Sequence, residues 1–178
     1  NYLGTNRTRA AYWGDFTYSA SKNWNIFATA FMAADTKQYP FNVWGIGVQG
    51  QLTPDWKVMA NYAWNTAQEA KDINTAIANG DGTTAWAAQI QYKGADKTKV
   101  GTWGLYVNYR DLKPMAMDFG LASGILGNDI GLGDGMNYGA LTTNVLGRKG
   151  WGFQGDYTIS KNVILTATYF ATEDVNSA

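Results

Sequence analysis

The sequence contains no cysteine and no histidine among its 178 residues. Without cysteine, the chain has no disulfide framework and no thiolate site. Without histidine, it lacks the commonest general base, the usual catalytic triads and the ligand of most zinc sites. These absences argue against most enzyme classes. We therefore assign the chain no catalytic residue, no metal site and no cofactor, and we expect that it is not an enzyme.

The chain also has no excess of charge, because 14 basic residues balance 14 acidic ones. A nucleic-acid-binding domain usually carries a basic excess, so we expect no nucleic-acid partner. The sequence has no run of about 18 consecutive apolar residues, which excludes a transmembrane helix.

Aromatic side chains, in contrast, are abundant: 15% of the residues, with 8 Trp and 11 Tyr, together with 21 Gly. The mean hydropathy is nevertheless only −0.29. The two features occur together in outer-membrane β-barrels, where only alternate residues of each strand face lipid. Composition therefore favours a β-barrel that spans a membrane with strands.

Two distant stretches are nearly the same, YSASKNWNIFATAF from Tyr18 and YTISKNVILTATYF from Tyr157. In each, a Ser-Lys-Asn turn separates two runs in which apolar and polar residues alternate. Alternation with a period of two is typical of β-strands with one buried or lipid-facing side. Each stretch is therefore predicted to be a β-hairpin, and the repeat indicates one structural solution used twice.

The same alternation predicts eight strands in four hairpins, at 12–19, 24–32, 44–52, 56–65, 86–93, 102–110, 151–159 and 163–172. The connections between them alternate between short and long, with long loops expected at 66–83 and 113–146. Outer-membrane barrels have short turns on one side of the membrane and longer loops on the other. The predicted fold class is therefore all-β, a transmembrane antiparallel up-and-down β-barrel.

Tryptophan recurs near the strand ends of the apolar face, as at Trp56 and Trp64. Aromatic rings concentrate at both membrane–water interfaces, so this spacing predicts a girdle at each interface. A sugar-stacking surface is the alternative interpretation. The girdle residues are predicted to be Trp24, Trp44, Trp56, Trp64, Trp86, Trp103 and Trp151.

The opposite, polar face is predicted to line a pore. Arginine keeps its charge near neutral pH, and rings of charged side chains set ion selectivity by their local field. The alternative is that these charges only solvate a barrel interior or loop ends. The pore-lining candidates are Arg7, Arg9, Asp15, Lys57, Gln89, Gln91, Arg110 and Asp156.

The pattern Tyr-x-x-Ser-Lys-Asn-x-x-(Leu/Ile)-x-Ala-Thr, at Tyr18 and again at Tyr157, resembles the periplasmic hairpins of bacterial general diffusion porins. The Trp-rich strands and the Ala, Thr and Gly content are most similar to the barrel region of the S-layer-homology-anchored porins of diderm Firmicutes. The resemblance implies an outer-membrane channel for passive diffusion of ions and small hydrophilic solutes. It also implies contact with lipid and lipopolysaccharide, and a homotrimer. A peptidoglycan tether would come through a segment that this sequence does not contain.

In porins of this kind, a long loop folds into the lumen and narrows it. The resemblance therefore implies a constriction role for Asp118, Asp129 and Asp134, whose charges would oppose a basic wall. The alternative is a loop that lies on the outer surface. The acidic residues lack the ligand spacing of an EF-hand loop, so no calcium site is assigned.

The sequence departs from the porin pattern in strand number and in its end. Eight strands are half of a sixteen-stranded barrel, and the chain ends with 174–178 rather than with an aromatic strand. We therefore expect these residues to be part of a larger barrel, since eight strands enclose only a side-chain-filled interior. The alternatives are a complete eight-stranded barrel with an anchoring or adhesive role, a barrel enzyme, and a soluble carbohydrate-binding sandwich.

Overall fold

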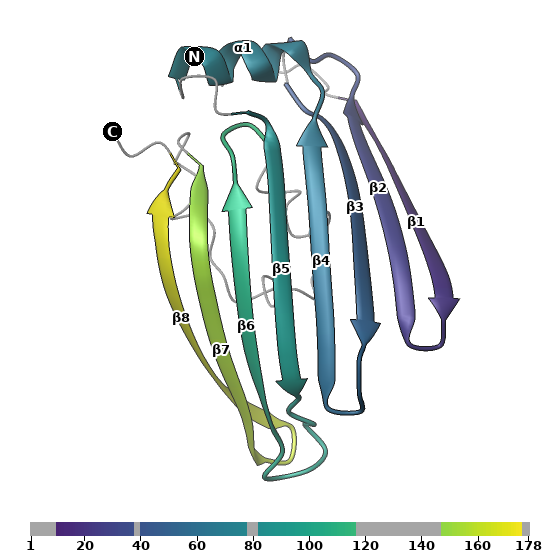
Figure 1. The fold of residues 1–178 in the computed structure, drawn as a ribbon, viewed down its shortest axis with the longest axis vertical. Helices are drawn as coiled ribbons and strands as arrows, with labels where there is room; N and C mark the ends of the chain where they lie inside the picture. The colour runs from purple at the N-terminus through teal and green to yellow at the C-terminus, as the bar shows by residue number, and fades with distance from the viewer. Residues whose placement is uncertain (1–9, 38–39, 78–81, 117–146, 176–178) are drawn as a thin grey trace.

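The computed structural model describes residues 10–37, 40–77, 82–116 and 147–175. Eight strands form one antiparallel sheet in which each strand pairs with its neighbours in the sequence (Figure 1). This order confirms the predicted eight-stranded up-and-down architecture. The strands are β1 (Ala11–Ser21), β2 (Trp24–Ala33), β3 (Asn42–Gln51), β4 (Trp56–Asn65), β5 (Thr84–Lys93), β6 (Trp103–Leu112), β7 (Arg148–Ser160) and β8 (Val163–Asp174).

The repeated sequence motif forms the same hairpin twice. In β1–β2 the strand pairing passes from Ser19↔Asn25 to Ser21↔Trp24, with one extra residue on β1. In β7–β8 the pairing passes in the same way from Thr158 to Ser160, with the extra residue on β7. Both hairpins therefore combine a two-residue Lys-Asn turn with a bulge, which pins the strand register.

Successive connections lie alternately at the two ends of the sheet (Figure 1). The short connections, 22–23, 52–55, 94–102 and 161–162, lie at one end, which we call the short-turn end. The long connections, 34–41, 66–83 and 113–147, leave the strands at the other end, the long-loop end. The two longest connections, 66–83 and 113–147, thus share one end, as predicted. The predicted alternation of length is not strict, because 94–102 has nine residues and 34–41 has eight.

The segment 66–83 is not a loop, as the sequence analysis expected, but contains the helix α1 (Gln68–Ile77). Ala70 and Asn74 are buried one turn apart on one side of α1, while Lys71 and Asp72 are exposed. The prediction was wrong because the segment is polar and has two Gly nearby, which is typical of a loop. In the described part of α1, the fully buried residues are only Ala70 and Asn74, so no run of large apolar residues indicated a helix. Within the described ranges, no helix is long and apolar enough to cross a membrane.

Asn65, the last residue of β4, joins three connections at the long-loop end. Its Nδ2 donates to the carbonyls of Pro40 and Met115, both at 2.8 Å. Its Oδ1 accepts hydrogen bonds from the backbone N–H groups of Asn42 and Ala67, both at 3.0 Å. A side chain that uses both its donor and its acceptor in a buried site fixes the segments around it.

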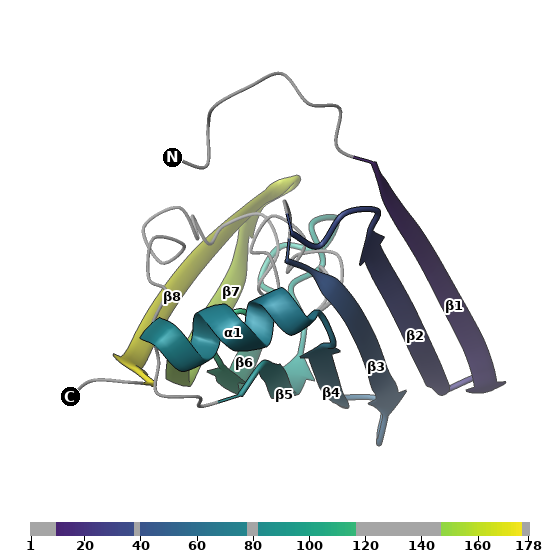
Figure 2. The same cartoon turned by 90° about the horizontal axis from the view of Figure 1, so that it is seen from above.

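Seen along the strands, the sheet is an arc with β1 and β8 at its two ends (Figure 2). In the described residues, β1 pairs only with β2, and β8 pairs only with β7. Every residue of β1 is exposed. Both edge strands are thus long and uncovered, and neither contains a proline that would block further pairing.

Candidate functional site

The apolar side chains of the sheet point to its outer, convex side. Because residues in cross-strand register share a face, the pairings of Trp44 with Trp64 and of Tyr62 with Trp86 place these rings together. The same register places all seven predicted girdle tryptophans on this apolar outer face. Most of its large side chains are exposed, including Ile46, Leu105 and Tyr169.

One row of aromatic rings crosses the outer face near the short-turn end. The ring centroids of Trp56 and Tyr92 are 4.7 Å apart, and those of Tyr92 and Trp103 are 5.6 Å apart. The ammonium group of Lys93 lies 5.3 Å from the Tyr92 ring and 5.2 Å from the Trp103 ring. This row therefore combines aromatic contacts with a cation–π contact.

A second aromatic row crosses the outer face toward the long-loop end. Tyr109 lies between Trp86 and Trp151, at centroid distances of 5.3 and 5.1 Å. Tyr62 and Trp64 lie 5.7 Å apart on β4. The sequence analysis assigned only tryptophans to the girdles. The contacts of these tryptophans with Tyr62, Tyr92 and Tyr109 follow from the strand register, which the sequence alone does not show.

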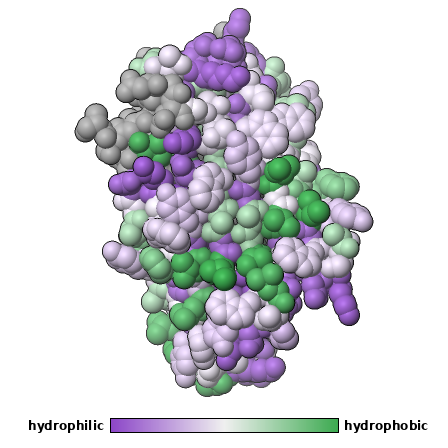
Figure 3. Space-filling view, in the orientation of Figure 1, coloured by the Kyte–Doolittle hydropathy of each residue, from purple (hydrophilic) through white to green (hydrophobic). Residues whose placement is uncertain are grey.

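An aliphatic band separates the two aromatic rows. It includes Val58, Ala60, Ala88, Ile90 and Val107, which line a shallow hollow of about 680 Å³ on this face. Figure 3 shows the convex side, with hydrophobic residues across its middle and hydrophilic residues at the end that carries α1. The outer face thus has an aliphatic centre between two aromatic borders.

The inner side of the sheet carries the polar residues. Register places Asp15, Lys57, Gln89, Gln91, Arg110 and Asp156 on this polar inner face. Their role in lining a pore stays a prediction. The other candidates, Arg7, Arg9, Asp118, Asp129 and Asp134, lie outside the described residues.

Arg110 belongs to a packed cluster on the inner face. Its guanidinium carbon lies 5.2 Å from the Phe170 ring, and its Nη2 donates to Asn108 Oδ1 at 2.6 Å. The Arg110 side chain is only 3% exposed. Gly152 makes room for the cluster, since an added Cβ would lie 2.6 Å from Asn108 Oδ1 and 2.7 Å from Phe170 Cε1. The sequence analysis missed this cluster because its members come from three strands.

Asp156 is held by neighbours on the same face. Thr166 Oγ1 donates to Asp156 Oδ1 at 2.8 Å across the β7–β8 pair. Gln154 Nε2 donates to the two carboxylate oxygens at 3.1 and 3.2 Å. These donors fix the position of a negative charge on the inner face.

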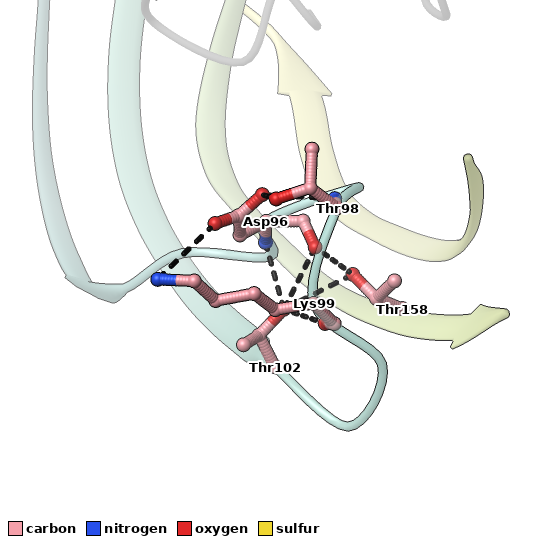
Figure 4. A network of polar contacts seen from close by, with 5 residues as sticks. All are labelled: Asp96, Thr98, Lys99, Thr102 and Thr158. Carbon is pink, nitrogen blue, oxygen red and sulfur yellow. Dashed lines mark hydrogen bonds and ion pairs between the residues drawn. The ribbon is translucent and has the colours of Figure 1, made fainter. Parts of the chain in front are cut away.

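The connection 94–102 is tied to β7 by a polar network at the short-turn end (Figure 4). Thr158 Oγ1 donates to the Asp96 carbonyl at 3.1 Å, and the Gly101 N–H donates to the Thr158 carbonyl at 2.9 Å. Thr102 Oγ1 accepts from the Asp96 N–H at 2.8 Å. The carboxylate of Asp96 accepts hydrogen bonds from the side chain and backbone of Thr98, which lower its pKa, and Lys99 lowers the pKa further.

Beside this network, a pocket of about 570 Å³ opens at the short-turn end; we call it the rim pocket. Its polar lining consists of Gln51, Asp55, Lys57, Gln91, Lys93 and Thr102. A smaller hollow of about 140 Å³ continues along the inner face and shares Lys57 and Gln91 with the rim pocket. Lys57 therefore lies at the junction between the pocket and the inner face.

No protein-family model matches the sequence, and no curated protein matches it significantly. In the parts of the chain that the structure describes, no three Asp or Glu residues gather as they would to hold a metal ion. The candidate site consists of the two faces of the sheet and the rim pocket at its short-turn end.

Proposed function

We propose that this sheet is the wall of an outer-membrane channel for passive diffusion of ions and small hydrophilic solutes. The observation that carries the proposal is the aliphatic band between two aromatic rows on the exposed outer face. A soluble protein rarely exposes an apolar surface that extends over several strands. A bilayer covers such a surface, and the aromatic rings then lie at its two interfaces.

The opposite face supports the same function. Its Lys, Gln, Asn and Asp side chains suit water and dissolved ions, and its charges would set selectivity by their local field. In hydrocarbon, every backbone N–H and C=O group must be paired within the protein, so a spanning sheet has to close. The open edges of β1 and β8 therefore favour additional strands, and a barrel of about sixteen strands fits the proposal.

The wider parts of the proposal rest on the resemblance to porins. They are an outer-membrane location, contact with lipid and lipopolysaccharide, a homotrimer, and a peptidoglycan tether through another segment. In this arrangement the connection 113–147 would supply the constriction, with the short turns on the periplasmic side.

A second candidate is an eight-stranded barrel with an anchoring or adhesive role and no open pore. The packed Arg110 cluster favours it, because the interior of a small barrel is filled by side chains. Against it stands the absence of any β1–β8 pair within the described ranges.

Single-channel recording separates the two candidates. The purified protein, reconstituted in a planar bilayer, is expected to give large, stable, ohmic conductance steps. A salt gradient should then give a reversal potential that shifts toward cation selectivity in Lys57→Glu. Silence, or rare and very small steps, would favour the filled eight-stranded barrel.

A further inference from the structure

We propose that the rim pocket binds the phosphate group of a small anion at the entrance to the polar inner face. The inference goes beyond the channel proposal, because a phosphate site at this place does not require an open pore. It rests on the row of polar side chains, the two lysines and the fixed wall that together make up the pocket.

Three cross-strand neighbours form the floor of the pocket. Lys57 on β4 pairs in register with Gln51 on β3 and with Gln91 on β5, so the three side chains lie in one row on the inner face. Gln51 Nε2 donates one hydrogen bond to the Pro54 carbonyl at 3.0 Å, and Gln91 Nε2 donates one to the Lys93 carbonyl at 2.6 Å. Each amide nitrogen has two N–H groups, so each retains a second donor.

The pocket has an excess of positive charge. Lys57 and Lys93 both line it, and Asp55 is the one acidic residue among its lining side chains. In the described part of the chain, neither lysine forms an ion pair. The ammonium group of Lys93 is positioned by the Tyr92 and Trp103 rings.

A phosphate group matches this set of donors better than a simple halide does. It carries up to two negative charges and several acceptor oxygens, so it can interact with the charges of the two lysines that line the pocket and accept from the amides. Chloride can balance the positive charge, but it is a single spherical ion and has no set of separate acceptor oxygens. A single carboxylate has one charge and two oxygens, and would leave part of the donor set unused.

The wall of the pocket is held in place. Gly101 and Thr102 belong to it, and both are tied to Thr158 by backbone hydrogen bonds of 2.9 Å. Gly101 has φ of +86°, which favours glycine at this point of the turn. A wall that is already ordered lowers the entropy cost of binding. The adjoining hollow along Gln49 and Gln89 gives a bound anion a polar path from Lys57 onto the inner face.

The test is a calorimetric titration of inorganic phosphate into the detergent-solubilised protein at constant ionic strength. We expect saturable binding that Lys57→Gln and Lys93→Gln each weaken about tenfold or more, since each removes a charge-assisted partner. Asp55→Asn should strengthen binding by removing the opposing charge. Lys22→Gln and Lys161→Gln are matched controls, because these lysines lie in the two other short turns and outside the pocket.

Competition identifies the source of the phosphate. Displacement of inorganic phosphate by vesicles of phosphatidylglycerol, but not of phosphatidylcholine, would assign a lipid headgroup, while no displacement would assign a soluble anion. The proposal is overturned if phosphate does not saturate, or if the Lys57 and Lys93 variants, shown to be folded by circular dichroism, bind like the two controls. Because the readout is binding, its failure is distinguishable from a failure of the conductance test.

Discussion

Trp56 and Trp64 lie near the two ends of β4 and on the same face of it, eight residues apart. At about 3.3 Å per residue, they are separated by about 26 Å along the strand. With the strand tilt of about 35–45° in outer-membrane barrels, this corresponds to a height of about 19–22 Å, somewhat less than their apolar band of about 25 Å. Ala60 lies midway between them, in the aliphatic band.

The position of Ala60 predicts a strong penalty for charge. Ala60→Lys should lower the free energy of unfolding in lipid vesicles by about 2–4 kcal/mol, because a lysine at the middle of the bilayer is poorly solvated. Gln49→Lys, on the inner face of the adjacent β3, is the control and should cost much less. Urea titrations of the vesicle-bound protein measure both. Equal costs would contradict a lipid-facing outer surface.

Asn65 is predicted to stabilise the whole long-loop end. Asn65→Ala removes the partners of two carbonyls and two N–H groups, and should lower the free energy of unfolding by about 2–4 kcal/mol. Thr66→Ala removes one exposed hydrogen bond to the Asn42 carbonyl and should cost about 1 kcal/mol or less. Equilibrium unfolding gives both values. If Asn65→Ala lowers the free energy of unfolding no more than Thr66→Ala does, the hydrogen bonds of Asn65 do not stabilise the long-loop end together.

Gly152 is predicted to tolerate no side chain. Gly152→Ala places a methyl group against Asn108 and Phe170, and should destabilise the protein by about 1–3 kcal/mol through overpacking. Gly155 is the matched control on the same strand, because an added Cβ there would meet Leu105 Cδ2 at an ordinary 3.6 Å. Thermal unfolding compares the two variants. Similar midpoints for both would contradict a packed Arg110 cluster.

Acid should weaken the network at the short-turn end. Hydrogen bonds from Thr98 hold the pKa of Asp96 below its ordinary value of 3.8. Since the folded-state pKa is the lower one, the stabilisation is full above the unfolded pKa and is lost as the pH falls through the folded pKa.

The Asp96→Asn variant tests this pH dependence. Its unfolding midpoint should lie below that of the wild type at about pH 6, and the difference should shrink as the pH falls below the ordinary carboxyl pKa and through the folded-state pKa. Lys99→Gln, which keeps the Thr98 contacts, should retain most of the wild-type pH dependence. A difference in unfolding midpoint between wild type and Asp96→Asn that stays constant as the pH falls would contradict the role of the carboxylate charge.

The strands and the tryptophan rows could be predicted from sequence because they depend on a local period of two. The Ser-Lys-Asn hairpins were predictable for the same reason, since turn and alternation lie within one short stretch. α1 was missed because its buried side, with Ala70 and Asn74, carries no hydrophobic stripe. Asn65 and Arg110 were missed as packing centres because their partners, Met115 and Phe170, lie 50 and 60 residues away in sequence.

The central claim is that the outer face meets lipid and the inner face meets water. The chain has no cysteine, so single-cysteine variants report on one site each. The outer positions Ile46 and Leu105 are each 52% exposed, whereas Gln49 and Gln91 on the inner face are only partly exposed. If water covered both faces, cysteines at the two outer positions would therefore react faster with a water-soluble thiol reagent than cysteines at the two inner positions.

The decisive measurement is labelling of these variants by a water-soluble maleimide in lipid vesicles. The predicted result is that Gln49→Cys and Gln91→Cys are labelled while Ile46→Cys and Leu105→Cys are protected, with all four labelled after denaturation. Rapid labelling of Ile46→Cys and Leu105→Cys in the vesicles would contradict the account, because it would place the apolar outer face in water.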